Sequence, residues 1–278
     1  MKTMKIVFLG SGNVATHLSQ ALNNSVSNEV VQVYSPTAEN AKSLAEILSC
    51  GYCTDINEVD VNADIYVCSV KDSVQQNVWR ALKSHFVGSG INVAGKIVVH
   101  TAGALAMDGE NGLSEFFPNC GVVYPVQSFS KQRAVDLSHT PFLIEATIPS
   151  TLEKLRSLVA TVSDRCYDAT TKQRNSLHPA AVFASNFANH MYAIANRLME
   201  KNGLPFEILI PLIQETAQKV TEVHPVAAQT GPAVRGDEVV MSKQEKGLTA
   251  DGYETELEIY RLVSKNIQTY RDEFQRES

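Results

Sequence analysis

The chain has 278 residues, of which 44% are hydrophobic and 19% are charged, and its formal net charge is −6. This composition is typical of a folded globular protein, and the length has room for about two domains. The acidic balance argues against nucleic-acid binding, which depends on clustered cations, and no apolar run reaches the roughly 18 residues that a membrane span needs.

The first residues predict a strand rather than a leader peptide. Only residues 6–9 are continuously apolar before Gly10, whereas a signal peptide needs an apolar core of about 7–15 residues. We therefore expect a cytoplasmic protein. The five cysteines are odd in number and scattered along the chain, which does not fit a disulfide framework.

The first half alternates short β-rich runs with helix-spaced apolar residues. Helices are expected over residues 13–22, 38–48 and 73–86. Strands are expected over residues 5–9, 30–34, 64–70, 96–100, 121–124 and 141–145. Alternation of this kind is typical of βαβ units, so the expected fold class is α/β, with a doubly wound, mostly parallel Rossmann sheet.

The pattern becomes helical in the second half. Ser150 is expected to cap a helix, and residues 165–168 to form one last strand. Further helices are expected over residues 171–201, 206–223, 238–246 and 254–274. We therefore predict two domains: an NADP-binding Rossmann-like domain over residues 1–165, and an all-α domain for substrate binding and dimerisation over residues 166–278.

A glycine-rich segment joins the first expected strand to the first expected helix. It reads Gly10, Ser11, Gly12, Asn13, Val14 and Ala15. The spacing matches G-x-G-x-x-G/A, in which the first glycine permits a tight turn and the second lets the backbone approach a pyrophosphate. The N–H groups that open the helix can then bind the phosphates. We expect a dinucleotide here; the alternative is a turn without a ligand.

The end of the second strand bears on the choice between NADP and NAD. An NAD site usually has Asp or Glu at this point, but here Ser35 and Thr37 flank Pro36. The two hydroxyls can donate hydrogen bonds to a 2′-phosphate, and no carboxylate repels it. The arginine expected for a 2′-phosphate is absent, so the sequence favours NADP over NAD without excluding NAD.

Three more polar segments follow strands, and parallel strands end at one edge of a sheet, where ligands bind. The candidate cofactor-binding residues there are Ser69, Val70, Lys71, Thr101 and Gly103. The alternative for Lys71 is a solvated loop cation. His100 is a candidate catalytic residue, or else a strand-end side chain bonded to the backbone. Tyr124 and Gln127 are candidates for substrate binding.

These segments, together with residues 230–237 in the second half, resemble those of bacterial oxidoreductases assigned as NADP-dependent. That family joins a Rossmann domain to a helical C-terminal domain of unknown function. Its first domain is similar to that of pyrroline-5-carboxylate reductases and of NADP oxidoreductases that use a deazaflavin. The resemblance covers nearly the whole chain and implies NADP binding, but it supplies no substrate.

The helix expected at 171–201 carries further candidates. His178, Val182, Ser185 and Asn186 share one helical face. In β-hydroxyacid dehydrogenases, which this architecture resembles, the matching helix carries a catalytic Lys and, four residues later, an Asn. Asn186 matches that Asn, but Val182 stands where the Lys would be. His178 is therefore the candidate proton donor, because imidazole titrates near neutral pH; the alternative is a helix-start residue before Pro179.

Two other features of the sequence are Arg235, whose role the sequence leaves open, and a cysteine pair for which a redox role is disfavoured. Arg235 could clamp a substrate carboxylate, pair with Asp237 or cap a helix. Cys50 and Cys53 spell C-x-x-C, but they follow the helix expected at 38–48 and meet its negative end, which disfavours a reactive thiolate. No further pair of ligands stands nearby, so no metal is expected.

The leading hypothesis is an oxidoreductase that transfers a hydride from NADPH to a C=O or C=N carbon of a small substrate. One alternative is an NADP-binding sensor without turnover, which the absence of Lys at 182 motivates. A thiol redox protein is the other. Small and apolar residues on several faces of the expected helix predict a homodimer built from residues 171–274. The alternative is that the α/β domain covers this apolar surface.

Overall fold

An eight-stranded sheet organises the computed structural model, which describes residues 3–277. The strands are β1 (Met4–Leu9), β2 (Asn28–Tyr34), β3 (Gly51–Cys53), β4 (Ile65–Cys68), β5 (Ile97–His100), β6 (Cys120–Pro125), β7 (Phe142–Ala146) and β8 (Cys166–Asp168). Their order is β3-β2-β1-β4-β5-β6-β7-β8, and only the β6–β7 pair is antiparallel. The expected doubly wound, mostly parallel sheet is confirmed.

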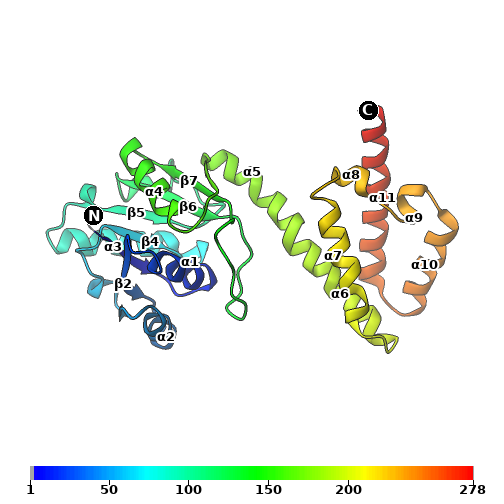
Figure 1. The fold of residues 1–278 in the computed structure, drawn as a ribbon, viewed down its shortest axis with the longest axis horizontal. Helices are drawn as coiled ribbons and strands as arrows, with labels where there is room; N and C mark the ends of the chain where they lie inside the picture. The colour runs from blue at the N-terminus through cyan, green and yellow to red at the C-terminus, as the bar shows by residue number, and fades with distance from the viewer. Residues whose placement is uncertain (1–2, 278) are drawn as a thin grey trace. The chain divides into compact units, whose positions relative to one another are not determined.

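Helices cover both faces of this sheet (Figure 1). They are α1 (Asn13–Asn23), α2 (Ala38–Leu48), α3 (Gln75–Gly88) and α4 (Pro149–Ala160). One expectation was wrong in detail: Ile148, not Ser150, precedes α4, because Pro149 takes the first helical position, where its missing N–H costs nothing. Within residues 3–277, no helix is both long and apolar enough to cross a bilayer.

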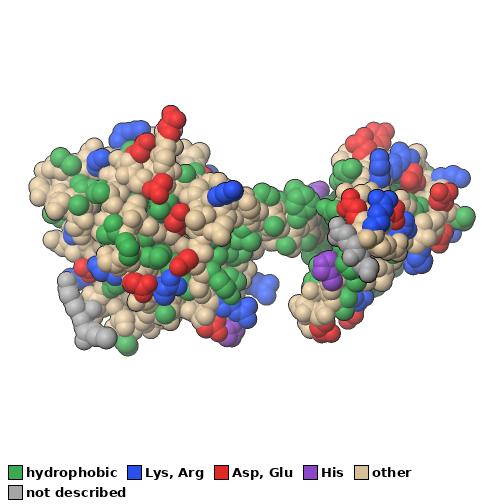
Figure 2. Space-filling view, turned by 90° about the horizontal axis from the view of Figure 1, so that it is seen from above, with side chains coloured by type: hydrophobic (Ala, Val, Ile, Leu, Met, Phe, Trp, Pro, Cys, Tyr) green, Lys and Arg blue, Asp and Glu red, His purple; other side chains and the backbone are tan. Residues whose placement is uncertain are grey.

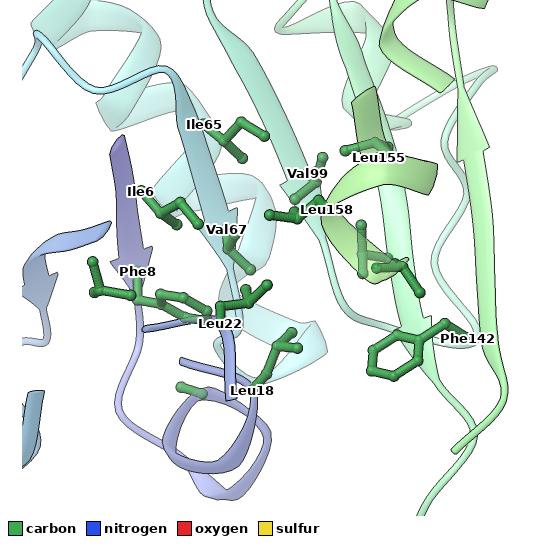
Figure 3. Packing of buried hydrophobic residues seen from close by; sticks show 14 of the residues in the cluster. Ile6, Phe8, Leu18, Leu22, Ile65, Val67, Val99, Phe142, Leu155 and Leu158 are labelled. Atoms are coloured by element: carbon green, nitrogen blue, oxygen red, sulfur yellow. The ribbon is translucent and has the colours of Figure 1, made fainter. Parts of the chain in front are cut away.

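The strands are apolar on both sides, so each face of the sheet buries its own core. In β1, Ile6 and Phe8 face α1 and α4, whereas Val7 and Leu9 face α3. Figure 3 shows the first core, in which Leu18 of α1 and Leu158 of α4 point toward the sheet. Burial on both faces fixes the register of the strands and therefore the positions of the loops at their ends.

The chain forms two compact units, Met1–Asn186 and Phe187–Ser278. A long helical stretch runs through α5 (Thr171–Ala181), a π-helical segment (Val182–Phe187) and α6 (Ala188–Lys201). A helix was predicted over this range, but the π-helical segment was not. It begins soon after Pro179, whose ring removes one hydrogen bond from α5. The predicted domain division at 165/166 stays a prediction.

The second unit is entirely helical in its described residues. After α6 come a 3-10 turn (Phe206–Leu209), α7 (Ile210–Lys219), α8 (Pro225–Ala228), α9 (Pro232–Arg235), α10 (Glu238–Ala250) and α11 (Glu254–Glu277). Among residues 187–276, the buried side chains are those of Ala233, Tyr253 and Ser264. Large apolar side chains stay exposed on its helices, including Leu212 at 62% and Leu262 at 70%. By itself the unit therefore encloses very little core.

Candidate functional site

The glycine-rich segment lies where β1 meets α1, beside the end of β4. Gly10 has a φ of +117°, and a Cβ on it would lie 2.5 Å from the carbonyl oxygen of Ser69. Its N–H donates to the carbonyl of Tyr34 at the end of β2. The need for glycine at position 10 is therefore explained by the fold alone.

Gly12 differs from Gly10, because nothing in the described chain requires a glycine there. Its φ is −76°, which any residue adopts, and a Cβ would meet no atom within 4 Å. It is exposed and immediately precedes α1, whose first turn carries no acidic side chain and no side-chain cap. The open space beside free helix N–H groups fits a phosphate. These residues fit the pyrophosphate of a dinucleotide.

Two pairs of buried hydroxyls lie at the carboxyl ends of the central strands. Ser11 Oγ donates to Ser35 Oγ at 3.0 Å, and Thr101 Oγ1 donates to Ser69 Oγ at 3.0 Å. Thr37 is exposed immediately before α2. Thus Ser35 and Thr37 follow β2 as expected, while their roles toward a 2′-phosphate stay predictions.

The other candidates after β4 have unequal exposure. Val70 is half-buried, and its Cγ1 packs 3.1 Å from the position of a Cβ on Gly10. Lys71 is exposed, and no ion pair joins it to another described residue. A cofactor role for Lys71 remains a prediction.

The structure places His100 in the core. Its side chain is 0% exposed, its Nδ1 accepts a hydrogen bond from the N–H of Ala102 at 3.2 Å, and its ring stacks on Trp79. Burial, helped by the charge of Arg174, lowers the pKa of His100 to about 3, so the ring is neutral. These contacts agree with the structural alternative that the sequence left open; a catalytic role stays a prediction.

A cleft of about 510 Å³ lies within the first unit. Six predicted residues line it: Asn13, Val14, Tyr124, Gln127, His178 and Asn186. Further lining residues are Val126, Ser128, Phe129, Ala181, Val182, Ala184 and Ser185. The cleft therefore brings the start of α1, the end of β6 and the helical stretch 178–186 together. His178, Val182, Ser185 and Asn186 do share one face, as the helical spacing predicted.

Gly103, Tyr124 and His178 meet at one edge of this cleft. A Cβ on Gly103 would lie 2.8 Å from Cζ of Tyr124 and 3.0 Å from Nδ1 of His178. A larger residue at 103 would therefore displace one or both rings. Burial raises the pKa of the Tyr124 phenol, so this group is a hydrogen-bond donor at neutral pH.

The long connection from β6 to β7, residues 126–141, lines one wall of the cleft with residues 126–129. The sequence pointed only to the start of this connection, at Gln127. We call residues 126–135 the strap. The Asn13 side-chain amide donates to the carbonyl of Phe129 at 2.9 Å, and His17 Nε2 contacts the carbonyl of Ser130 at 2.9 Å. The rings of His17 and Phe129 stack at 5.4 Å. A connection of this length without regular structure is itself a signal of a binding loop.

Three further residues singled out in the sequence do not line the cleft. Arg235 belongs to the second unit, whereas Cys50 precedes β3 and Cys53 ends it. Arg235 is exposed at the end of α9, while the Asp237 carboxylate accepts from the N–H of Val240 and caps α10. Burial raises the pKa of both Cys50 and Cys53 to about 11. Both are therefore protonated thiols at neutral pH, which weighs against the thiol redox alternative.

Comparison with known proteins agrees with this arrangement. Residues 5–101 match the family described as NADP oxidoreductase, coenzyme F420-dependent, and residues 140–267 match a domain of unknown function. A crystal structure of a "putative NADP oxidoreductase" from Bacteroides fragilis is 41% identical, covers 96% of this chain and 98% of its own, and has a TM-score of 0.86. No curated protein matches.

Two more distant structures share the fold. A pyrroline carboxylate reductase from Plasmodium falciparum, with NADP bound, is 17% identical over 96% of this chain and 99% of its own, with a TM-score of 0.56. An imine reductase from Streptomyces aurantiacus is 14% identical over 97% of this chain and 95% of its own, with a TM-score of 0.66. Taken with the glycine-rich segment and the cleft, the matches show that the chain belongs to the NADP oxidoreductase family that combines a Rossmann domain with this helical domain of unknown function.

Proposed function

We propose that the protein is an NADPH-dependent reductase that transfers a hydride to the C=O or C=N carbon of a small substrate. The observation that carries this proposal is the cleft. It joins the start of α1, where a dinucleotide fits, to two ring side chains that can handle a proton, His178 and Tyr124. A reductase needs these two elements within reach of one substrate.

The residues of the first unit divide into two groups in this proposal. The open space over Gly12 and the first N–H groups of α1 hold the pyrophosphate, and Ser35 and Thr37 favour NADP over NAD at the adenosine ribose. When bound, the cofactor supplies the hydride. His178 holds a proton at a ring nitrogen and donates it to the substrate heteroatom, while Asn186 and Gln127 orient the substrate by hydrogen bonds.

The lining of the cleft supports a weakly polar substrate. Apart from His178, every polar side chain among the thirteen lining residues is an amide or a hydroxyl, and none is Asp, Glu, Lys or Arg. Amides and hydroxyls recognise a carbonyl or an imine without a net charge to be balanced. Val126, Val182 and Phe129 supply the apolar surface beside them.

An NADP-binding sensor without turnover is the second candidate. It rests on Val182, which lines the cleft at the position where the resembling dehydrogenases carry a lysine. A valine side chain cannot move a proton, so this task would fall to His178 and Tyr124. If neither donates a proton, the cleft binds its ligand but does not convert it.

Titration with NADPH and NADH, followed by a panel of aldehydes, ketones and cyclic imines, separates the two candidates. A reductase binds NADPH more tightly than NADH and oxidises it with at least one panel member. His178→Asn then lowers turnover on the order of 100-fold or more while NADPH still binds. Tight NADPH binding with no oxidation by any panel member would support the sensor instead.

We propose further that two copies associate through the helical residues 171–274. Support comes from residues 187–276, in which the buried side chains are those of Ala233, Tyr253 and Ser264. Figure 2 shows hydrophobic side chains along the surface of the long helical stretch, where Phe183 is 69% exposed and Phe187 is 48% exposed. Apolar faces of this extent are typical of protein interfaces.

A further inference from the structure

The first turn of α5 is tied to the sheet by a buried ion pair. Arg174 is 0% exposed, and its Nη1 donates a hydrogen bond to the carboxylate of Glu145 on β7. Its Nη1 also donates to the carbonyl of Ala169 at 3.2 Å, and its Nη2 donates to that of Leu105 at 3.0 Å. A charge buried this completely is tolerated only when it is well paired, so the geometry of the pair is tightly constrained.

Glu145 uses both carboxylate oxygens in the same cluster. One accepts from the N–H of Thr171 and the other from its hydroxyl, each at 3.1 Å. The Thr171 hydroxyl oxygen in turn accepts from the N–H of Met107 at 3.2 Å. Three segments are thereby joined: β7, the start of α5, and the connection that follows β5.

Two of these segments carry the residues that meet at the cleft. His178 is four residues after Arg174, one turn further along the same face of α5. Gly103 stands two residues before Leu105, whose carbonyl Arg174 binds. The third partner, Tyr124, lies on β6 and pairs directly with Leu143 of β7. The pair therefore connects all three elements on which the close approach of His178 and Tyr124 depends.

We propose that Glu145 and Arg174 are positioning residues that hold His178 against Tyr124 and Gly103. Neither side chain lines the cleft, so they act through the placement of α5 and of the connection after β5. Displacing a reacting group by about 1 Å can lower a rate on the order of 100-fold. This role rests on the proposed function, in which His178 donates the proton.

The chain provides a matched control for this pair. Arg156 of α4 donates to Asp168 of β8 at 2.7 Å, but this pair is far more exposed, at 38% and 55% of the two side chains, and neither residue binds α5. Replacing Glu145 by Gln keeps the size of the side chain and removes its charge. Asp168→Asn makes the same change in the exposed pair.

The direct measurement is the NMR signal of the His178 ring in protein labelled at histidine, assigned with His178→Asn. Because the Tyr124 ring contributes a ring-current shift to this signal, Tyr124→Leu gives its position when that ring is absent. We expect Glu145→Gln to move the His178 signal toward that of Tyr124→Leu, while Asp168→Asn leaves it in place. If Glu145→Gln folds and its His178 signal does not move, the proposal is wrong, and the ion pair only stabilises the fold.

Ligand binding and kinetics supply the second measurement. Glu145→Gln should lower kcat at least about tenfold with a smaller change in KM, and leave NADPH affinity within about twofold. A lower unfolding midpoint with unchanged kcat would also contradict the positioning role. The NMR measurement needs no substrate, so a moved signal without any turnover would leave this role intact and count against the reductase instead.

Milder substitutions keep the test decisive if Glu145→Gln does not fold. Arg174→Lys retains the charge but cannot reach Glu145 and the Leu105 carbonyl together through a planar fork. Thr171→Val removes only the bridging hydroxyl. Each variant should move the His178 signal in the same direction by a smaller amount. If both variants fold and neither moves the signal, the proposal is wrong.

Discussion

The fold constrains only one of the two glycines in the segment after β1. Gly10 has a positive φ and lies against the Ser69 carbonyl, whereas Gly12 has neither constraint. Sequence alone treats the two as equal members of one motif. The structure separates Gly10, which the fold needs, from Gly12, for which we propose a ligand as the reason.

Substituting each glycine tests this separation. Gly12→Val should leave the unfolding midpoint near its original value and weaken NADPH binding at least about tenfold, because the added side chain fills the space for phosphate. Gly10→Ala should lower the free energy of unfolding by about 1–3 kcal/mol through backbone strain. Calorimetry of binding and denaturant unfolding measure the two effects, and equal NADPH affinity in Gly12→Val would mean that the segment is only a turn.

His100 makes stability depend on pH. In the folded state burial lowers its pKa to about 3, whereas in the unfolded chain it titrates near about 6.5. Below that value the unfolded state binds a proton that the folded state refuses, so stability is lost as the pH falls from about 6.5 toward 3. The slope from this residue approaches about 1.4 kcal/mol per pH unit.

Urea unfolding between pH 7 and pH 4.5 checks this dependence. His100→Leu should flatten the curve relative to the parent protein. His139→Gln is the control: His139 is 71% exposed and contacts Asp164 at 2.9 Å, so its replacement should change the slope less than His100→Leu does. An equal slope in the parent and in His100→Leu would show that His100 titrates normally in the folded chain.

At the scale of elements, period and composition predict most of the fold. Strands buried on both faces and helices with one apolar stripe have strong local signals, so α2 is predicted to the residue and β5 to within one residue. The π-helical segment and the strap have no such signals. They are determined by what packs beside them, which a single sequence does not contain.

The candidate site also combines residues that the sequence predicts with an arrangement that only packing determines. Sequence predicts His178, Tyr124 and Gly103 separately, from a helical face and from strand ends. Their meeting depends on the distance between α5 and the sheet, which Glu145 and Arg174 set. Neither residue stands in a recognisable motif, so only the structure identifies them.

The strap should loosen when its bond to α1 is removed. Asn13→Ala deletes the hydrogen bond to the Phe129 carbonyl, and one such bond contributes about 1 kcal/mol. Trypsin cleavage after the exposed Lys131 and Arg133 should then accelerate about fivefold. Gln20→Ala is the control, since that amide bonds only within α1, and equal cleavage rates in both variants would show that Asn13 does not hold the strap.

At the scale of the whole molecule, the two units differ in how much core they enclose. The first has two large clusters of buried side chains, one on each face of the sheet. Among the described side chains of the second, thirteen large apolar ones are exposed and only Tyr253 is buried. This difference supports a homodimer built from the helical residues.

Sedimentation at micromolar concentration tests this assembly. A dimer has twice the 30.4 kDa mass of the chain. Leu262→Glu, on the exposed face of α11, should shift the protein toward single chains. Val26→Glu is the control at a site 97% exposed in the first unit, and a parent protein that sediments near 30 kDa would rule the dimer out.

The hydrogen bond between Asn13 and the Phe129 carbonyl has a thermodynamic consequence. Asn13 belongs to the segment that fits a pyrophosphate, and Phe129 belongs to a wall of the cleft. A ligand at either place that favours one arrangement of this bond changes the free energy of binding at the other. Thermodynamic linkage requires the two changes in binding free energy to be equal. If the bound cofactor raises the affinity of the cleft for its ligand by some factor, that ligand raises the affinity for the cofactor by the same factor.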